Sequence, residues 1–172
     1  VLMEKHDTPL VSLSAMIPGG APGDVPGREG TASLFGDLIQ KGADTRDAAQ
    51  FAEAVESVGG ALSAGADTES VNLSASFMAK DVDLMIELAS DVLQRPRLAP
   101  EEFEKVRSLA VQSIAAAKDS DPRALVGEYG DAWLFHGHPY GRPTDGNEQT
   151  LAQVTLDDVK RYYAEQVGGD RL

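Results

Sequence analysis

The residues of this chain that most resemble a chemical site lie between Gly30 and Gly42, in a segment with helical spacing. Ser33, Gly36 and Asp37 have the spacing of the H-x-x-E-H pattern, in which two histidines on one helical face hold zinc and the glutamate acts as general base. Zinc is held by imidazole nitrogens, and a hydroxyl, a missing side chain and one carboxylate do not replace them. This segment therefore predicts a helix with the layout of a metal site and without its ligands.

The side chains that remain in this segment are poorly suited to catalysis. Asp37 offers one carboxylate and Ser33 a neutral hydroxyl, and no general base is left to activate a water molecule. Gly36 inside a helix costs about 1 kcal/mol relative to alanine. We therefore expect no catalytic residue and no metal ligand here, and we attribute Gly36 either to close packing of another backbone or to simple tolerance.

The histidines offer a second, weaker candidate for a metal site. His136 and His138 form an H-x-H pair, which on a strand would place both imidazoles on one side. The third histidine, His6, lies far away in the sequence. We favour a loop in which His138 makes a local hydrogen bond and Tyr140 packs against it, and a metal centre at the pair remains an alternative.

Two further segments are expected to be structural. The glycine-rich stretch 18–30 lacks the lysine and Ser/Thr ending of a phosphate-binding loop, so it is expected to connect a strand to a helix. Trp133 and Phe135 fall in a segment with helical spacing, and we expect both rings to pack in the core.

Composition limits the classes of function that the chain can serve. Its 172 residues include 28 acidic and 15 basic side chains, for a net charge of −13. A phosphate backbone would be repelled, so nucleic acid is not an expected partner. No apolar run reaches the roughly 20 residues that a membrane-spanning helix needs. Absence of cysteine excludes disulfides and leaves the compartment open, periplasmic or cytoplasmic.

Apolar periodicity divides the chain into strands and helices. Alternation of apolar residues, as at Val71, Leu73, Ala75 and Phe77, is typical of strands, and recurrence every three or four residues is typical of helices. The expected strands are 1–5, 10–17, 61–66 and 71–78, and the expected helices are 28–42, 47–58, 80–94, 100–117, 123–135, 150–154 and 156–166. Strand pairs interleaved with helix pairs favour a single α+β domain over 1–172, with an antiparallel sheet covered on one face by helices.

Several short motifs occur in an order that resembles one protein family. The motifs are Pro18-Gly19-Gly20, Gly27-Arg28-Glu29-Gly30, Lys41-Gly42, Val55-Glu56-Ser57-Val58-Gly59-Gly60, Phe103-Glu104-Lys105 with Arg107, and His138-Pro139-Tyr140-Gly141-Arg142-Pro143. Together they span nearly the whole chain and resemble the N-terminal domain of the M16 metallopeptidases, the family of pitrilysin and the mitochondrial processing peptidase. The resemblance implies a two-layer α/β roll of the LuxS/MPP-like metallohydrolase type and, in active members, zinc-dependent hydrolysis of peptides inside a chamber built from several such domains.

The same resemblance extends the set of replaced positions. It places the family's third zinc ligand, a glutamate on the helix that follows residue 100, at Ser113, and a supporting glutamate at Val106. It implies structural roles for Gly19, Gly20, Gly30, Gly42, Pro139 and Tyr140. It also implies that the chain stops before the last strand of its domain and before a second homologous domain.

These observations favour a non-catalytic peptidase-like domain or subunit without a cofactor. Such a protein would act with an active M16 peptidase subunit or a homologous domain in the binding and processing of peptides. Two alternatives stay open: an active zinc endopeptidase with a displaced site at His136 and His138, and a purely structural scaffold subunit.

Overall fold

The computed structural model describes residues 3–4, 7–120, 123 and 126–168. Three strands form the sheet: β1 (Leu10–Pro18), β2 (Ala61–Ala66) and β3 (Ser70–Met78). The helices are α1 (Thr31–Ile39), α2 (Ala48–Glu56), α3 (Val82–Gln94), α4 (Pro100–Ser120), α5 (Val126–Leu134), α6 (Glu148–Leu151) and α7 (Leu156–Gln166), with short 3₁₀ turns at η1 (Ala21–Gly23), η2 (Ala79–Asp81) and η4 (Pro139–Gly141).

The sheet is antiparallel, in the order β1-β3-β2. Ile17 of β1 lies opposite Val71 of β3, and Leu62 of β2 lies opposite Ala75. The carboxylate of Asp67 accepts hydrogen bonds from the backbone N–H groups of Glu69 and Ser70, both at 2.8 Å, and so closes the turn between β2 and β3. The hairpin expected from the sequence is therefore confirmed.

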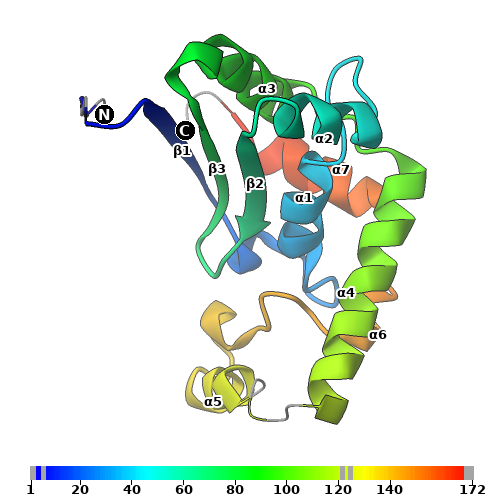
Figure 1. The fold of residues 1–172 in the computed structure, drawn as a ribbon. Coiled ribbons are helices and arrows are strands. Elements are labelled where there is room, and N and C mark those ends of the chain that lie inside the picture. Colours follow the sequence, from blue (N-terminus) through cyan, green and yellow to red (C-terminus); the bar gives the residue numbers. More distant parts are fainter. Residues whose placement is uncertain (1–2, 5–6, 121–122, 124–125, 169–172) are drawn as a thin grey trace.

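One face of the sheet is apolar and carries the helices. Val71, Leu73, Ala75 and Phe77 of β3 are buried, and α1 and α3 pack against this strand. The other face exposes small polar side chains, among them Ser12, Ser14 and Ser74. Figure 1 shows this arrangement, with α1, α2, α3 and α7 gathered beside the three strands. The chain thus has the expected α+β fold, with an antiparallel sheet covered on one face.

The ends of the chain depart from the expected elements in two places. The prediction of a strand at 1–5 is wrong at Met3 and Glu4, which belong to no strand. The other residues of this predicted strand lie outside the described part of the chain. Met3 is 87% exposed, and β1 already pairs along its length with β3. The helix expected at 150–154 forms instead as α6, at Glu148–Leu151, because Asn147 caps it by accepting from the N–H groups of Gln149 and Thr150.

Helix α5 lies apart from the sheet, at the lower left in Figure 1, and contacts η4. Trp133 on this helix is 83% exposed, so the expectation that its ring packs in the core was wrong. Phe135 is 36% exposed and contacts the ring of Tyr140 at 5.9 Å instead of the core, so the expectation was wrong for this ring too. The spacing of apolar residues predicted a helix here, and it forms at Val126–Leu134. Among the described residues, no layer of the core covers its Trp133 side.

Candidate functional site: the cavity between α1 and α4

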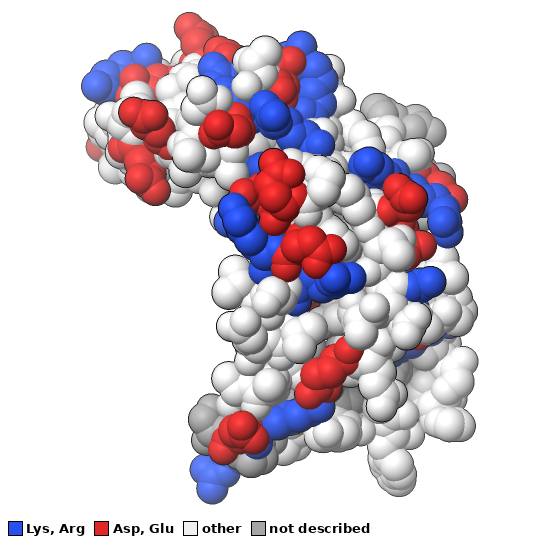
Figure 2. Space-filling view, turned by 90° about the vertical axis from the view of Figure 1, so that its right-hand side faces the viewer, with Lys and Arg blue, Asp and Glu red and all other residues white. Residues whose placement is uncertain are grey.

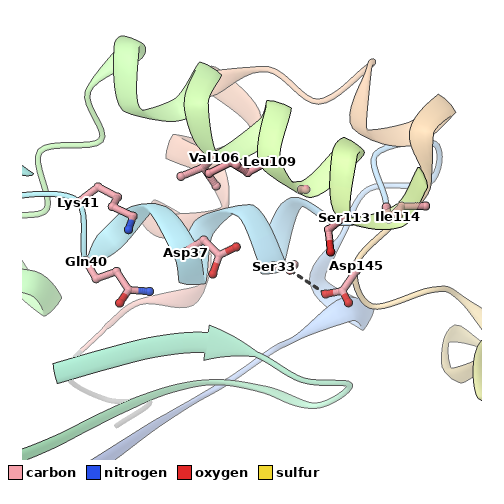
Figure 3. A pocket seen from close by; sticks show the side chains of 10 residues that line it. Ser33, Asp37, Gln40, Lys41, Val106, Leu109, Ser113, Ile114 and Asp145 are labelled. Carbon is pink, nitrogen blue, oxygen red and sulfur yellow. Dashed lines mark hydrogen bonds between the residues drawn. The ribbon is translucent and has the colours of Figure 1, made fainter. Parts of the chain in front are cut away.

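A cavity of about 370 Å³ lies between α1 and α4. Figure 3 shows the polar ends of Ser33, Asp37, Ser113 and Asp145 around it. The residues that line it come from α1, the two residues after α1, α4 and the loop before α6: Ser33, Asp37, Gln40, Lys41, Val106, Leu109, Ala110, Ser113, Ile114 and Asp145. The volume is in the range of small-ligand pockets, which is roughly 300–1,000 Å³.

Helix α1 presents Ser33 and Asp37 to this cavity because its opposite face is held in the core. Leu34, Phe35, Leu38 and Ile39 are each 1% exposed. Residues four apart on a helix share a face, so Ser33 and Asp37 point together to the side that the core leaves free. The shared helical face expected for Ser33 and Asp37 is therefore confirmed.

The start of α1 is fixed by a buried carboxylate. Asp24 accepts hydrogen bonds from the N–H of Gly30 at 2.7 Å and of Ala32 at 2.8 Å. Burial raises the pKa of Asp24 to about 7, outweighing the opposite effect of these backbone donors. Gly30 has a φ of 96°, and a Cβ there would lie 2.7 Å from a methyl carbon of Leu151, so this position excludes a side chain.

Helix α4 supplies the other wall of the cavity. Phe103 and Val106 are buried in the core, and the Nη1 of Arg107 donates a hydrogen bond to the carbonyl of Val154 at 3.2 Å. These contacts direct Leu109, Ala110, Ser113 and Ile114 toward α1. The helix runs to Ser120, one turn longer than expected.

Of the positions singled out in the sequence, four come together at this cavity and one does not. Ser33 and Asp37 from α1 face Val106 and Ser113 from α4. Gly36 lies on a different side of α1, where a Cβ would approach the carbonyl carbon of Gly65 in β2 to 2.8 Å. The expected close packing of another backbone is therefore confirmed, and Gly36 is the contact point between α1 and β2.

Sequence reasoning missed Asp145, the second carboxylate of the cavity, as well as Gln40 and Lys41. Ser33 donates a hydrogen bond through its Oγ to the Oδ1 of Asp145 at 2.8 Å. Asp145 follows η4, and a Cβ on the next residue, Gly146, would lie 2.3 Å from the carbonyl oxygen of Glu29. The Asp-Gly pair predicts a turn, but nothing in the local sequence indicates that this turn closes against the start of α1.

The charges of the cavity are not balanced by its own residues. Burial, and next the neighbouring carboxylate of Asp145, raise the pKa of Asp37, while Lys41 lowers it. The Asp37 side chain is nevertheless in contact with solvent, so it lies at the open side of the cavity. On the surface around α4, by contrast, acidic and basic side chains are interspersed (Figure 2), as in the 2.6 Å ion pairs Lys105–Glu102 and Arg107–Glu104.

The donor atoms of the cavity are a poor match for zinc. Asp37 and Asp145 supply carboxylates and Ser33 and Ser113 supply hydroxyls, whereas protein zinc sites rely on histidine and cysteine. Within the part of the chain that the structure describes, no three His, Cys, Asp or Glu side chains lie close enough together to share a metal ion.

The histidine pair lies away from this cavity, in an exposed segment. His138 accepts a hydrogen bond through its Nδ1 from the backbone N–H of Tyr140 at 3.2 Å, and the two rings are 4.9 Å apart, edge to face. The local hydrogen bond and the ring contact expected for this loop are confirmed.

Comparison with known proteins identifies the family. The family model described as Insulinase (Peptidase family M16) matches residues 1–148. The chain belongs to peptidase family M16. The glycines to which this resemblance assigned structural roles, Gly19, Gly20, Gly30 and Gly42, all have positive φ, at 149°, 54°, 96° and 105°.

The M16 chain is similar to curated proteins of diverse names. It is 29% identical over 143 residues to an "Uncharacterized zinc protease" of Mycobacterium leprae, covering 83% of this chain and 32% of that protein. It is 31% identical over 134 residues to a protein of the same name from Mycobacterium tuberculosis, covering 78% of this chain and 30% of that protein. It is also 23% identical over 172 residues to the bovine cytochrome b-c1 complex subunit 1, covering 100% of this chain and 36% of that subunit.

Solved structures share the M16 fold. A peptidase M16 inactive domain from Pseudomonas fluorescens superposes with a TM-score of 0.87 at 20% identity, over 94% of this chain and 39% of that one. A protease from Helicobacter pylori superposes with a TM-score of 0.85 at 19% identity, over 95% of this chain and 40% of that one.

The chain spans about a third of the length of the curated relatives that it matches. None of the helices in its described part combines the length and apolar character needed to cross a bilayer.

Proposed function

We propose that this M16 domain is non-catalytic and that it works beside an active peptidase partner, holding peptides that the partner cleaves. The observation that carries the proposal is the lining of the cavity between α1 and α4. The resemblance assigns the family's three ligand positions to Ser33, Asp37 and Ser113, and all three side chains line this cavity.

The physical argument is one of coordination and of acid–base chemistry. Three hydroxyl or carboxylate side chains without an imidazole bind zinc weakly, because zinc in proteins favours nitrogen and sulfur donors. Gly36 stands where the family's general base would be and has no side chain to activate water. A domain without a metal or a base would still have the cavity between α1 and α4, and this cavity supports a role in holding peptides.

Similarity to the bovine cytochrome b-c1 complex subunit 1 favours a second candidate function. It covers the whole of this chain, and a subunit of a large complex can serve as a scaffold without binding peptides. Co-purification separates the two roles. A bound M16 chain with an intact H-x-x-E-H motif supports the first, and a stable complex without peptide binding supports the second.

The decisive experiment uses the full-length protein that contains this domain. Its zinc content is measured after purification without added metal, and its peptidase activity is assayed alone and with the co-purifying M16 partner. We expect no zinc at the cavity between α1 and α4, no cleavage by the protein alone, and faster cleavage when the partner is present. Stoichiometric zinc that is lost on changing Asp37 to alanine, together with cleavage in the absence of a partner, would show that the domain is an enzyme.

The displaced zinc site has its own control in the same assay. His136→Ala and His138→Ala should change neither zinc content nor the stimulated activity, because the Nδ1 of His138 is engaged with the backbone of Tyr140. Loss of bound zinc in these two variants would instead support the displaced site.

A further inference from the structure

The cavity between α1 and α4 has one polar side and one apolar side. Asp37, Asp145, Ser33 and Ser113 provide acceptor oxygens. The wall formed by α4 adds aliphatic side chains, Val106, Leu109, Ala110 and Ile114. A few convergent polar groups on an otherwise apolar wall are the usual lining of a ligand pocket.

The polar side carries an excess of negative charge. Asp37 and Asp145 face one lysine, Lys41, at the rim. No hydrogen bond or ion pair joins the Asp37 carboxylate to a described residue, and Asp145 is held by the neutral hydroxyl of Ser33. Both carboxylates line the same cavity. Burial, and next the repulsion by Asp145, raise the pKa of Asp37. A cation in this cavity would offset this repulsion.

We propose that this cavity binds the side chain of a lysine in a bound peptide, with its ammonium group between Asp37 and Asp145 and its aliphatic stem along α4. The inference rests on the proposed function, since it names the chemical group that a peptide-holding domain would recognise. Asp37 stands where the resemblance places a histidine of the family, and Asp145 stands at no position that the resemblance marked, so the preference for lysine would belong to this chain.

The geometry of the acceptors favours an ammonium over a guanidinium group. An ammonium has three donors on one atom, which can reach two carboxylates on different elements and the oxygen of Ser33 or Ser113. A guanidinium presents a planar fork that is best matched by both oxygens of a single carboxylate. The unbranched stem of lysine also suits the side chains of Leu109 and Ile114, which leave an apolar wall beside the acids.

The test measures binding of four short fluorescent peptides to the full-length protein by anisotropy. The peptides have blocked ends and differ only at one central residue, which is lysine, N-acetyl-lysine, norleucine or arginine. We expect the lysine peptide to bind about tenfold more tightly than the acetyl-lysine and norleucine peptides, which is the effect of losing one charge-assisted hydrogen bond.

Three variants locate the effect. Asp37→Asn and Asp145→Asn should each abolish most of the preference for lysine over acetyl-lysine. Glu53→Gln, an exposed change on α2 that also removes one negative charge, should leave the preference unchanged. Circular dichroism and a thermal melt verify that all three variants are folded.

Each other outcome overturns the inference. Equal binding of the lysine and acetyl-lysine peptides, a preference that survives in Asp145→Asn, tighter binding of the arginine peptide, or no binding of any peptide would remove the lysine site. The first three results would leave the proposed function standing, because the domain would still bind peptides and its zinc content and the stimulation of a partner would be unaffected. Absence of binding to any peptide would instead count against the proposed function as well, and would support the scaffold role.

Discussion

Ser33 and Asp145 are 112 residues apart in the sequence and share a hydrogen bond of 2.8 Å across the cavity. The bond joins α1 to the loop before α6, and so closes one end of the space that α1 and α4 enclose. The short side chain of Ser33 thus anchors a loop from the far end of the chain to the first turn of α1.

Rebuilding the ligands should restore metal binding. The triple variant Ser33→His, Asp37→His and Ser113→Glu places two imidazoles and a carboxylate at one cavity, and we expect it to bind about one zinc ion per chain by isothermal titration calorimetry. It should remain without peptidase activity, because Gly36 supplies no general base.

A matched control moves the glutamate to Ser108, which lies on α4 outside the lining of this cavity. The variant Ser33→His, Asp37→His and Ser108→Glu has the same composition and should bind zinc much more weakly. Equal affinity of the two triple variants would show that Ser113 is not the position of the third ligand.

A methyl group at Gly36 should destabilise the fold. Gly36→Ala would push a Cβ to within 2.8–3.0 Å of the backbone of Gly65 and Ala66. Overpacking of this kind costs about 1–3 kcal/mol, which should appear as a lower midpoint of urea unfolding. Gly127→Ala on α5, where a Cβ meets nothing within 4 Å, is the control and should be neutral or slightly stabilising. An unchanged midpoint for Gly36→Ala would mean that α1 can move away from β2 at no cost.

Asp24 should make the free energy of unfolding depend on pH. The pKa of Asp24 in the folded state is about 7, against an ordinary value of 3.8, so the folded protein binds more protons than the unfolded chain between these values. Stability should therefore fall as pH rises from about 4 to 7, by up to about 1.4 kcal/mol per pH unit from this group. Asp24→Asn should remove that part of the slope.

Other carboxyl groups also contribute to the pH dependence, because the pKa of Asp37 is raised as well and the pKa values of Asp67 and Asp158 are lowered. Comparing the wild type with Asp24→Asn across pH isolates the contribution of Asp24. Urea unfolding at half-unit pH steps measures it. A constant difference in stability between the wild type and Asp24→Asn from pH 4 to 7 would contradict the raised pKa.

A buried carboxylate on α3 should be important for stability. Asp91 is 3% exposed and contacts Arg46 at 3.3 Å and Arg95 at 2.5 Å. Removing its charge leaves two arginines without their shared partner. Because both arginines remain partly hydrated, we expect Asp91→Asn to cost about 2 kcal/mol, below the range for a fully buried pair.

Glu87→Gln is the control for this network. Glu87 pairs with Arg46 at 2.6 Å, but its side chain is 53% exposed, so its loss should cost less than about 1 kcal/mol. Thermal or urea unfolding of both variants makes the comparison. Equal costs would indicate that burial of Asp91 does not strengthen its ion pairs.

Local patterns predicted the elements and one face of the site. The alternation in β3 and the i, i+4 relation of Ser33 and Asp37 each depend on neighbouring residues, so both follow from the sequence. The capping box at Asp47 fixes the start of α2 in the same way. Such features need no knowledge of the tertiary structure.

Features that depend on distant segments were harder to foresee. Ser113 and Val106 were placed only through resemblance to the M16 family, and Asp145 was missed because its loop meets α1 from the far end of the chain. Trp133 was misplaced for a related reason. An apolar stripe predicts which side of a helix avoids water, but it cannot tell whether another layer is present to cover that side.

The contact between α1 and β2 limits which side chains position 36 can carry. A Cβ at Gly36 would already lie 2.8 Å from the backbone of Gly65, so a longer side chain with a carboxylate has no volume to occupy unless the two backbones separate. Installing a general base at this position would therefore require a shift of the main chain in addition to the substitution itself. An engineered active site in this domain has to be designed together with the spacing between the helix and the sheet.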